Sequence, residues 1–257
     1  MVVIPAIVIL GCAGDSDQAG DSKQESGQKT LSHVYEKLGP FQGWQKQRFD
    51  NVVFIYSPEH ANLEELKDYA KVFSALTRQT ASFLQIEPPD SLTIYFYPDA
   101  KHGITVTGFF APFAEGEVIH FWLPSQIGQP IAKLLIPIWS NKEPKHRFLK
   151  HGIIALLDGS GENYHVRTMK YVDSGQFVPL KKLAVDTSVD ADRERYRSAM
   201  AASFVDYLVF DYGIFFFKEL YESDSTFDSE VERIFKLPVD SLEKKWLEVV
   251  RRVVSEK

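Results

Sequence analysis

The sequence predicts an α+β protein, in which a small N-terminal sheet with one long helix is followed by a mostly helical C-terminal half. Short runs of β-branched and aromatic residues, typical of strands, occur at 51–57, 91–98 and 116–124. Beyond residue 125 the apolar residues recur at helical spacing instead. Strands gathered early and helices gathered late favour an α+β chain over alternating α/β units.

The long helix is expected at 64–86, between the first two strands. Its apolar and small side chains recur every three or four residues, with charged residues on the other side of the helix. They are Leu66, Tyr69, Ala70, Phe73, Leu76, Thr77, Thr80 and Phe83. This periodicity predicts one face packed against the sheet and one face in water.

The C-terminal half is expected to consist of helices joined by turns. Helices are predicted at 129–139, 147–159, 193–213 and 241–256, and the apolar run at 212–221 is explained by helical packing. The sequence Gly-Ser-Gly at 159–161 follows a helix and lacks the Lys-Ser/Thr of a phosphate-binding loop, so it predicts a turn.

Length and charge limit the class of protein. The 257 residues suffice for one large domain or two small ones, and 44% hydrophobic with 25% charged residues is ordinary for a globular protein. The formal net charge of −6 and the lack of a basic stretch argue against a nucleic-acid partner.

The N-terminus is predicted to be a lipoprotein signal. An apolar run of about ten residues ends at Cys12, the only cysteine, and Ile9-Leu10-Gly11-Cys12 resembles the lipobox of bacterial lipoproteins. The resemblance implies a signal peptide at 1–11, lipid attachment at Cys12, and a domain facing the periplasm or the exterior of the bacterial cell envelope. No Lys or Arg precedes the apolar run, which departs from the usual signal, and the alternative is a buried N-terminal strand.

Residues 12–43 then form a lipidated tether and lead-in, because 13–30 carries no large apolar side chain. The remaining 44–257 is expected to be one domain, with a sheet-containing half at 44–125 and a helical half at 126–257.

The order of these elements resembles the peptidase MA-like group of gluzincin zinc metallopeptidases over most of 45–255. A strand ending in Leu123-Pro124 leads to a helix, then to the sequence FLKHG at 148–152, and later to SFVDYL…YG and SLE…W. The resemblance implies a zincin-like fold. In that group a helix carries H-E-x-x-H, whose two histidines bind zinc and whose glutamate activates water, and the next helix supplies a third ligand.

The chain departs from that pattern at the metal site. H-E-x-x-H occurs nowhere, and the best register puts Gln129 and Lys133 at the histidine positions, Pro130 at the glutamate and His151 at the third ligand. Glutamine is a poor zinc ligand, a protonated lysine repels the metal, and proline cannot act as a base. These four positions are therefore interpreted as vestigial, with no catalytic residue and no cofactor.

Two alternatives stay open for the polar residues at 148–165. A rebuilt zinc site could use His151, Glu162 and His165, which would make the protein an active metal-dependent hydrolase or peptidase. The other interpretation is that these residues are simply polar groups at a helix end and turn. His146 lies on a different helical face from His151, since five residues turn a helix by roughly 140°.

Lys133 lends itself to two interpretations. As a cation in the former metal site, it would pair with Glu162 or with Asp158. Alternatively, it reaches solvent from a two-turn helix between Pro130 and Pro137.

The function expected from these features is a membrane-anchored, non-catalytic binding or scaffold module. A peptide or protein ligand is expected in the former cleft, bordered by the aromatic loop and edge strand within 108–122.

Overall fold

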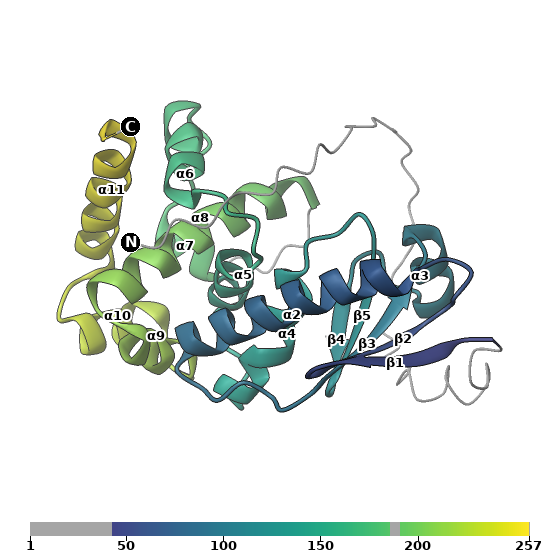
Figure 1. Cartoon of the computed structure of the whole chain (residues 1–257). Coiled ribbons are helices and arrows are strands. Elements are labelled where there is room, and N and C mark those ends of the chain that lie inside the picture. Colours follow the sequence, from purple (N-terminus) through teal and green to yellow (C-terminus); the bar gives the residue numbers. More distant parts are fainter. Residues whose placement is uncertain (1–42, 186–190, 257) are drawn as a thin grey trace. The chain divides into compact units, whose positions relative to one another are not determined.

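The computed structural model describes residues 43–185 and 191–256, without the side chains of 191–196 (Figure 1). Residues 43–257 form one compact unit. The signal peptide, the lipid attachment at Cys12 and most of the tether lie outside the described residues. The predicted α+β class is confirmed, because the described strands all precede residue 123 and eight of the ten described helices follow them.

The sheet has five strands in the order β1-β2-β3-β5-β4. The three central strands run parallel, and each outer strand is antiparallel to its neighbour. The strands are β1 (Gln45–Phe49), β2 (Val52–Tyr56), β3 (Leu92–Tyr97), β4 (Phe113–Glu115) and β5 (Val118–Trp122). The three predicted strands are β2, β3 and β5.

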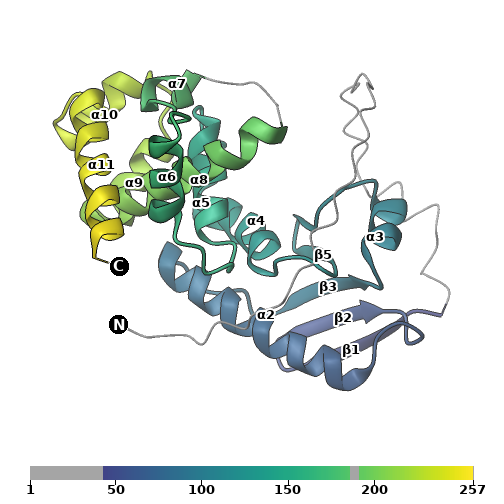
Figure 2. The ribbon, with the colours of Figure 1, turned by 90° about the horizontal axis from the view of Figure 1, so that it is seen from above.

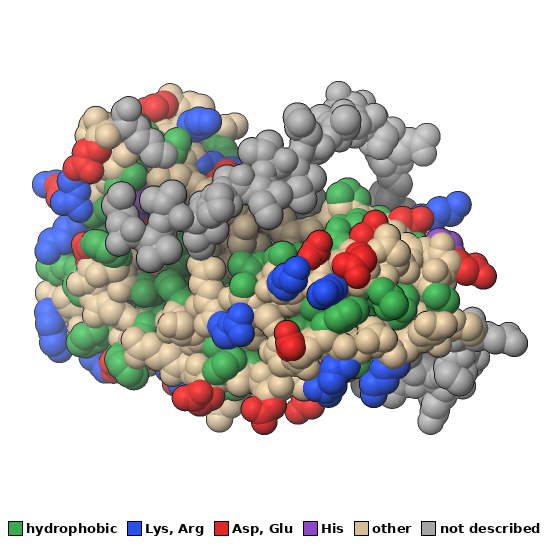
Figure 3. All heavy atoms as spheres, viewed as in Figure 1, with side chains coloured by type: hydrophobic (Ala, Val, Ile, Leu, Met, Phe, Trp, Pro, Cys, Tyr) green, Lys and Arg blue, Asp and Glu red, His purple; other side chains and the backbone are tan. Residues whose placement is uncertain are grey.

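Helix α2 (Leu63–Leu84) covers one face of the sheet and matches the helix expected at 64–86 (Figures 1 and 2). Asn62 begins it, because the side chain accepts a 2.9 Å hydrogen bond from the backbone N–H of Glu65. The buried side chains of α2 meet alternate strand residues, among them Phe54 and Phe121. The outward face carries acidic and basic side chains mixed together (Figure 3), as the periodicity predicts.

The opposite face of the sheet holds a buried histidine among aromatic rings. His120 of β5 is 1% exposed. Its ring stacks on Tyr95 and Phe113, with centroids 5.2 and 4.6 Å away, and its Nδ1 lies 2.8 Å from the hydroxyl oxygen of Tyr97. Burial lowers the pKa of His120 to about 4, so this imidazole is neutral at physiological pH.

The remaining described helices are α3 (Ala100–Thr107), α4 (Gly128–Trp139), α5 (Arg147–Leu156), α6 (Tyr164–Asp173), α7 (Leu180–Val185), α8 (Ala191–Asp211), α9 (Ile214–Tyr221), α10 (Phe227–Phe235) and α11 (Val239–Ser255). All except α3 follow the last strand in the chain. Helix α4 links the two halves, since it packs against α2, β4 and β5 on one side and against α5 on the other. The two-turn interpretation expected this helix to end at Pro137, but the helix continues past that residue. It has 12 residues and contains that proline, which leaves the carbonyl of Lys133 without its usual helical hydrogen bond.

Two glycines let helices approach closely. A Cβ atom on Gly152 of α5 would lie 2.7 Å from the carbonyl oxygen of Ala201 in α8. A Cβ atom on Gly128, the first residue of α4, would collide with the backbone of Asp158, just beyond α5. Both contacts are with backbone atoms, which cannot move aside as a flexible side chain can.

Candidate functional site

A cleft of about 1140 Å³ lies where α4, α5 and the edge strand β4 meet, with α6 and α8 contributing to its wall. The lining is mixed, with apolar side chains from α4 and α5 and seven charged side chains. The charged residues of the lining are Lys133, Glu143, Arg147, Lys150, Asp158, Glu162 and Arg167.

Three of the four positions expected to be vestigial line this cleft. Gln129 and Lys133 are one turn apart on α4, and His151 faces them from α5. Pro130 is buried in the first turn of α4. Proline lacks a backbone N–H, but in the first turn an N–H would have no helical acceptor, so no helical hydrogen bond is lost. Gln129, Lys133 and His151, which the resemblance assigns to metal-ligand positions, therefore line one cavity in the structure.

Lys133 is half-buried and makes no hydrogen bond or ion pair with any residue that the structure describes. Burial, reinforced by the positive charge of Lys150, lowers the pKa of its amine from the ordinary 10.5. The lysine is neither paired nor fully solvated, so it matches neither of the two interpretations that the sequence offers.

The acidic groups of the cleft are all bonded to other partners. Glu162 accepts from the Arg167 guanidinium at 2.9 and 2.7 Å. Asp158 accepts from the Tyr164 hydroxyl at 2.7 Å and from the backbone N–H of Ser160 at 2.7 Å. Neither carboxylate therefore pairs with Lys133, contrary to the neighbours that the sequence suggested.

Lys150 is neutralised locally in the same way. Its ammonium donates to both carboxylate oxygens of Glu143 at 2.6 Å. Arg147 is an exposed residue of the lining, and it makes no ion pair with a described residue.

His165 is directed away from the cleft, into the packing between α6, α8 and α11. Its Nδ1 lies 2.7 Å from Oγ of Ser203, and its Nε2 lies 3.1 Å from a carboxylate oxygen of Asp206. The indole N–H of Trp246 donates to the same serine oxygen at 2.9 Å.

The order serine, histidine, aspartate is that of a hydrolase triad, but this one has no room for a substrate. Ser203 is 0% exposed and its oxygen is already occupied by Trp246. We interpret the three residues as an internal polar contact that fixes α6 against α8.

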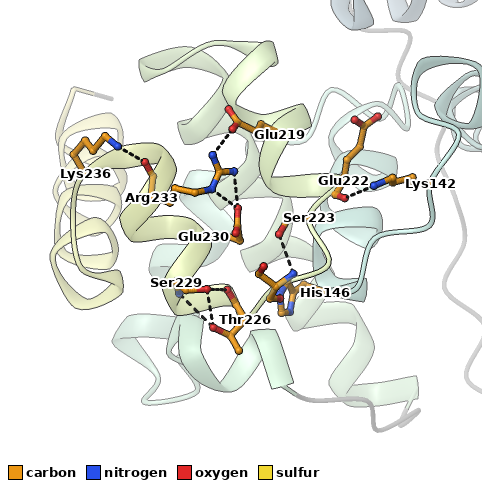
Figure 4. A network of polar contacts seen from close by, with 11 residues as sticks. Lys142, His146, Glu219, Glu222, Ser223, Thr226, Ser229, Glu230, Arg233 and Lys236 are labelled. Atoms are coloured by element: carbon orange, nitrogen blue, oxygen red, sulfur yellow. Dashed lines mark hydrogen bonds and ion pairs between the residues drawn. The ribbon is translucent and has the colours of Figure 1, made fainter.

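His146 also lies outside the cleft. Its two ring nitrogens face the backbone carbonyl oxygens of Ala184 and Ser225, at 3.2 and 3.3 Å. It belongs to a polar network around α9 and α10, in which Arg233 pairs with both Glu230 and Glu219 (Figure 4).

The residues at the expected metal positions do not suit zinc. Zinc in proteins is held by thiolate, imidazole and carboxylate groups, whereas Gln129 offers an amide and Lys133 an ammonium that repels a cation. His151, Glu162 and His165 do not converge, since the latter two are bonded to Arg167 and to Ser203. Across the described ranges, no group of three or more His, Cys, Asp or Glu residues is placed to hold a metal ion.

Sequence reasoning missed several charged residues of the cleft, among them Glu143, Arg147 and Lys150. The charge of Arg147 was visible next to FLKHG, but its place in the lining depends on how α5 packs. The stretch 108–122, which was expected to border the cleft, contributes Ala114 to the lining. Its strand β4 has three residues and is too short for a periodicity signal.

Comparison with known proteins gives little further information. No family model matches the chain, and no curated protein matches it. Among solved structures, it is similar to a mutant of a two-domain M1 zinc metallopeptidase with L-tryptophan bound, with a TM-score of 0.44 and 10% identity. The match covers 79% of this chain and 50% of that chain, so the protein spans about half the length of that structure.

Proposed function

We propose that this protein is a non-catalytic binding module whose cleft holds an extended peptide, and that it is anchored to a bacterial membrane by a lipid on Cys12. One observation carries the proposal. In the lining of a cleft of about 1140 Å³, the position that the resemblance assigns to a zinc-binding histidine holds the half-buried ammonium of Lys133. A site of this composition is suited to binding rather than to metal-assisted hydrolysis.

The edge strand supports a peptide as the ligand. Among the described strands, β4 pairs with β5 only, so its other edge has no strand beside it. Ala114, in the middle of β4, lines the cleft. An extended peptide can add to such an edge through backbone hydrogen bonds, while neighbouring pockets receive its alternate side chains.

Equilibrium dialysis of the full-length protein in detergent against a randomised pentapeptide library tests the proposal. We expect the protein to retain a subset of peptides, and Gln129→Trp to abolish retention by filling the cleft. Gln176→Trp is the matched control, because Gln176 is exposed and does not line the cleft. The retained peptides should be recovered intact by mass spectrometry.

Cleavage of the library would contradict the non-catalytic part of the proposal. In particular, hydrolysis that disappears in His151→Ala would favour the metal-dependent hydrolase instead. Equal retention by the protein and by Gln129→Trp would contradict the cleft as the binding site.

The membrane anchor rests on the sequence around Cys12, which precedes the described residues. No helix in the described part of the chain is long and apolar enough to cross a membrane. Mass spectrometry of the membrane fraction should find an acylated peptide that begins at Cys12. Recovery of an unprocessed peptide that begins at Met1, from cells expressing the native gene, would contradict the anchor.

A further inference from the structure

We propose that Lys133 and Arg147 form a carboxylate-binding subsite in the cleft, and that the bound peptide places a carboxylate there. The inference rests on the proposed function, because it names the group that the cleft recognises. It follows from the distribution of charge among the residues that line the cleft.

The lining holds four basic side chains, two of lysine and two of arginine, and three carboxylates. Lys150 is bonded to Glu143, Arg167 is bonded to Glu162, and the third carboxylate, Asp158, is bonded to Tyr164 and Ser160. Lys133 and Arg147 are the two cations of the lining that no described acidic residue neutralises.

The position of Lys133 is more informative than that of Arg147. An exposed lysine or arginine without a partner is ordinary, since water solvates it. A half-buried ammonium has lost part of that solvation and has gained no hydrogen bond in exchange. A ligand carboxylate would restore the lost interaction, whereas a neutral ligand that covered the amine would remove more of its water.

The excess charge also fits a carboxylate better than a phosphate. With four cations against three carboxylates, the lining carries one net positive charge. One carboxylate would neutralise it, while a dianionic phosphate would leave an excess of negative charge beside Glu143, Asp158 and Glu162.

The neighbouring groups can complete the subsite. Gln129 lies one turn before Lys133 on the same face of α4 and can donate a further hydrogen bond from its amide. The guanidinium of Arg147 can donate two parallel hydrogen bonds to one carboxylate. Ile154 in the same lining offers an apolar surface to the side chain next to that carboxylate.

Two forms of the randomised pentapeptide library test the inference, one with free C-terminal carboxylates and one with C-terminal amides. We expect the full-length protein to retain the free-acid library at least tenfold more than the amidated one. If the carboxylate instead comes from a side chain, the retained amidated peptides should be enriched in Asp and Glu. Either result supports the subsite, and the two results distinguish the sources of the carboxylate.

Charge variants of Lys133 test its contribution to the subsite. Lys133→Met and Lys133→Gln should both remove the preference for a carboxylate, and Lys133→Arg should retain part of it. Lys101→Met, a change at an exposed lysine of α3 outside the cleft, should leave the preference unchanged. Circular dichroism melts show whether each variant is folded.

The failures of the two proposals are distinguishable. If acid and amide libraries are retained equally without enrichment in Asp or Glu, and Gln129→Trp abolishes both, the carboxylate subsite is wrong and the peptide-binding cleft stands. If neither library is retained, or if Gln129→Trp has no effect, both proposals are wrong. If the carboxylate preference persists in Lys133→Met and Lys133→Gln, the assignment to Lys133 is wrong.

Discussion

Burial acts on a basic side chain in two regions of this protein, with different outcomes. On the sheet, His120 is enclosed by aromatic rings, and burial lowers its pKa to about 4. In the cleft, burial and the positive charge of Lys150 lower the pKa of the Lys133 amine from the ordinary 10.5.

The difference lies in what each region provides for the base. His120 becomes neutral and has the Tyr97 hydroxyl at 2.8 Å, so its polar group is satisfied inside the fold. Lys133 has no such partner among the described residues. A satisfied polar group belongs to the stability of the protein, whereas a half-buried charge without a partner is available to a ligand.

The largest expected effect is the pH dependence that His120 causes. Its pKa of about 4 in the folded protein lies below the ordinary 6.5, so between these pH values the unfolded chain binds a proton that the folded protein does not. Stability is therefore lost as the pH falls from 6.5 to 4, by roughly 3 kcal/mol when the shift is converted. Urea unfolding at several pH values measures this loss.

His120→Phe should be less stable at pH 7 but should lose less stability on acidification. His60→Phe, at an exposed histidine, should keep the full dependence. An NMR titration of the His120 ring in the folded protein with a midpoint above pH 6 would refute the explanation.

The next effect concerns the internal contact at Ser203. Its polar groups, like those of His120, have hydrogen-bond partners inside the fold. Ser203→Ala would leave Nδ1 of His165 and the indole N–H of Trp246 without their partner, and each loss is worth about 1–3 kcal/mol. We expect a total loss of about 3 kcal/mol in the free energy of unfolding, measured by urea denaturation.

Ser198→Ala is the matched control on the same helix, because Ser198 lines the cleft. It should change stability by no more than about 0.5 kcal/mol. Equal losses in the free energy of unfolding for the two substitutions would contradict the distinction between the hydrogen-bonded interior and the cleft.

The smallest expected effect is that of Lys133→Met. Since the ammonium makes no ion pair with a described residue, its removal leaves no carboxylate unpaired, and stability should change by at most about 0.5 kcal/mol or rise slightly. Denaturant unfolding with unchanged m-values measures this. A loss of several kcal/mol would mean that a buried acid pairs with Lys133, and the cleft would then resemble the interior.

The elements that the sequence predicted are those with a long or strong pattern. The helix expected at 64–86 is α2. Its 22 residues are enough for the helical periodicity to repeat over several turns. Strand β1 was missed because Gln45–Phe49 is mostly polar and lies at the edge of the sheet, where its sequence need not alternate. Helix α3 was missed as well, since Gly103 and four β-branched residues within 8 positions weaken the helical signal.

The candidate site was predictable only in part. Gln129, Lys133 and His151, which the resemblance assigns to one site, line one cleft in the structure. The side-chain partners were not predictable. The contact of His165 with Ser203 spans 38 residues, and a single sequence contains no signal for a pairing at that distance.

The close helix contacts at Gly128 and Gly152 have a consequence for tracing distant relatives. A polar side chain in the cleft can be exchanged when the ligand changes, without disturbing the packing of the helices. The two glycines are different, because any side chain there would push against the backbone of Asp158 or Ala201. These small residues at the start of α4 and in the middle of α5 should therefore outlast the ligand-binding residues as a mark of shared ancestry.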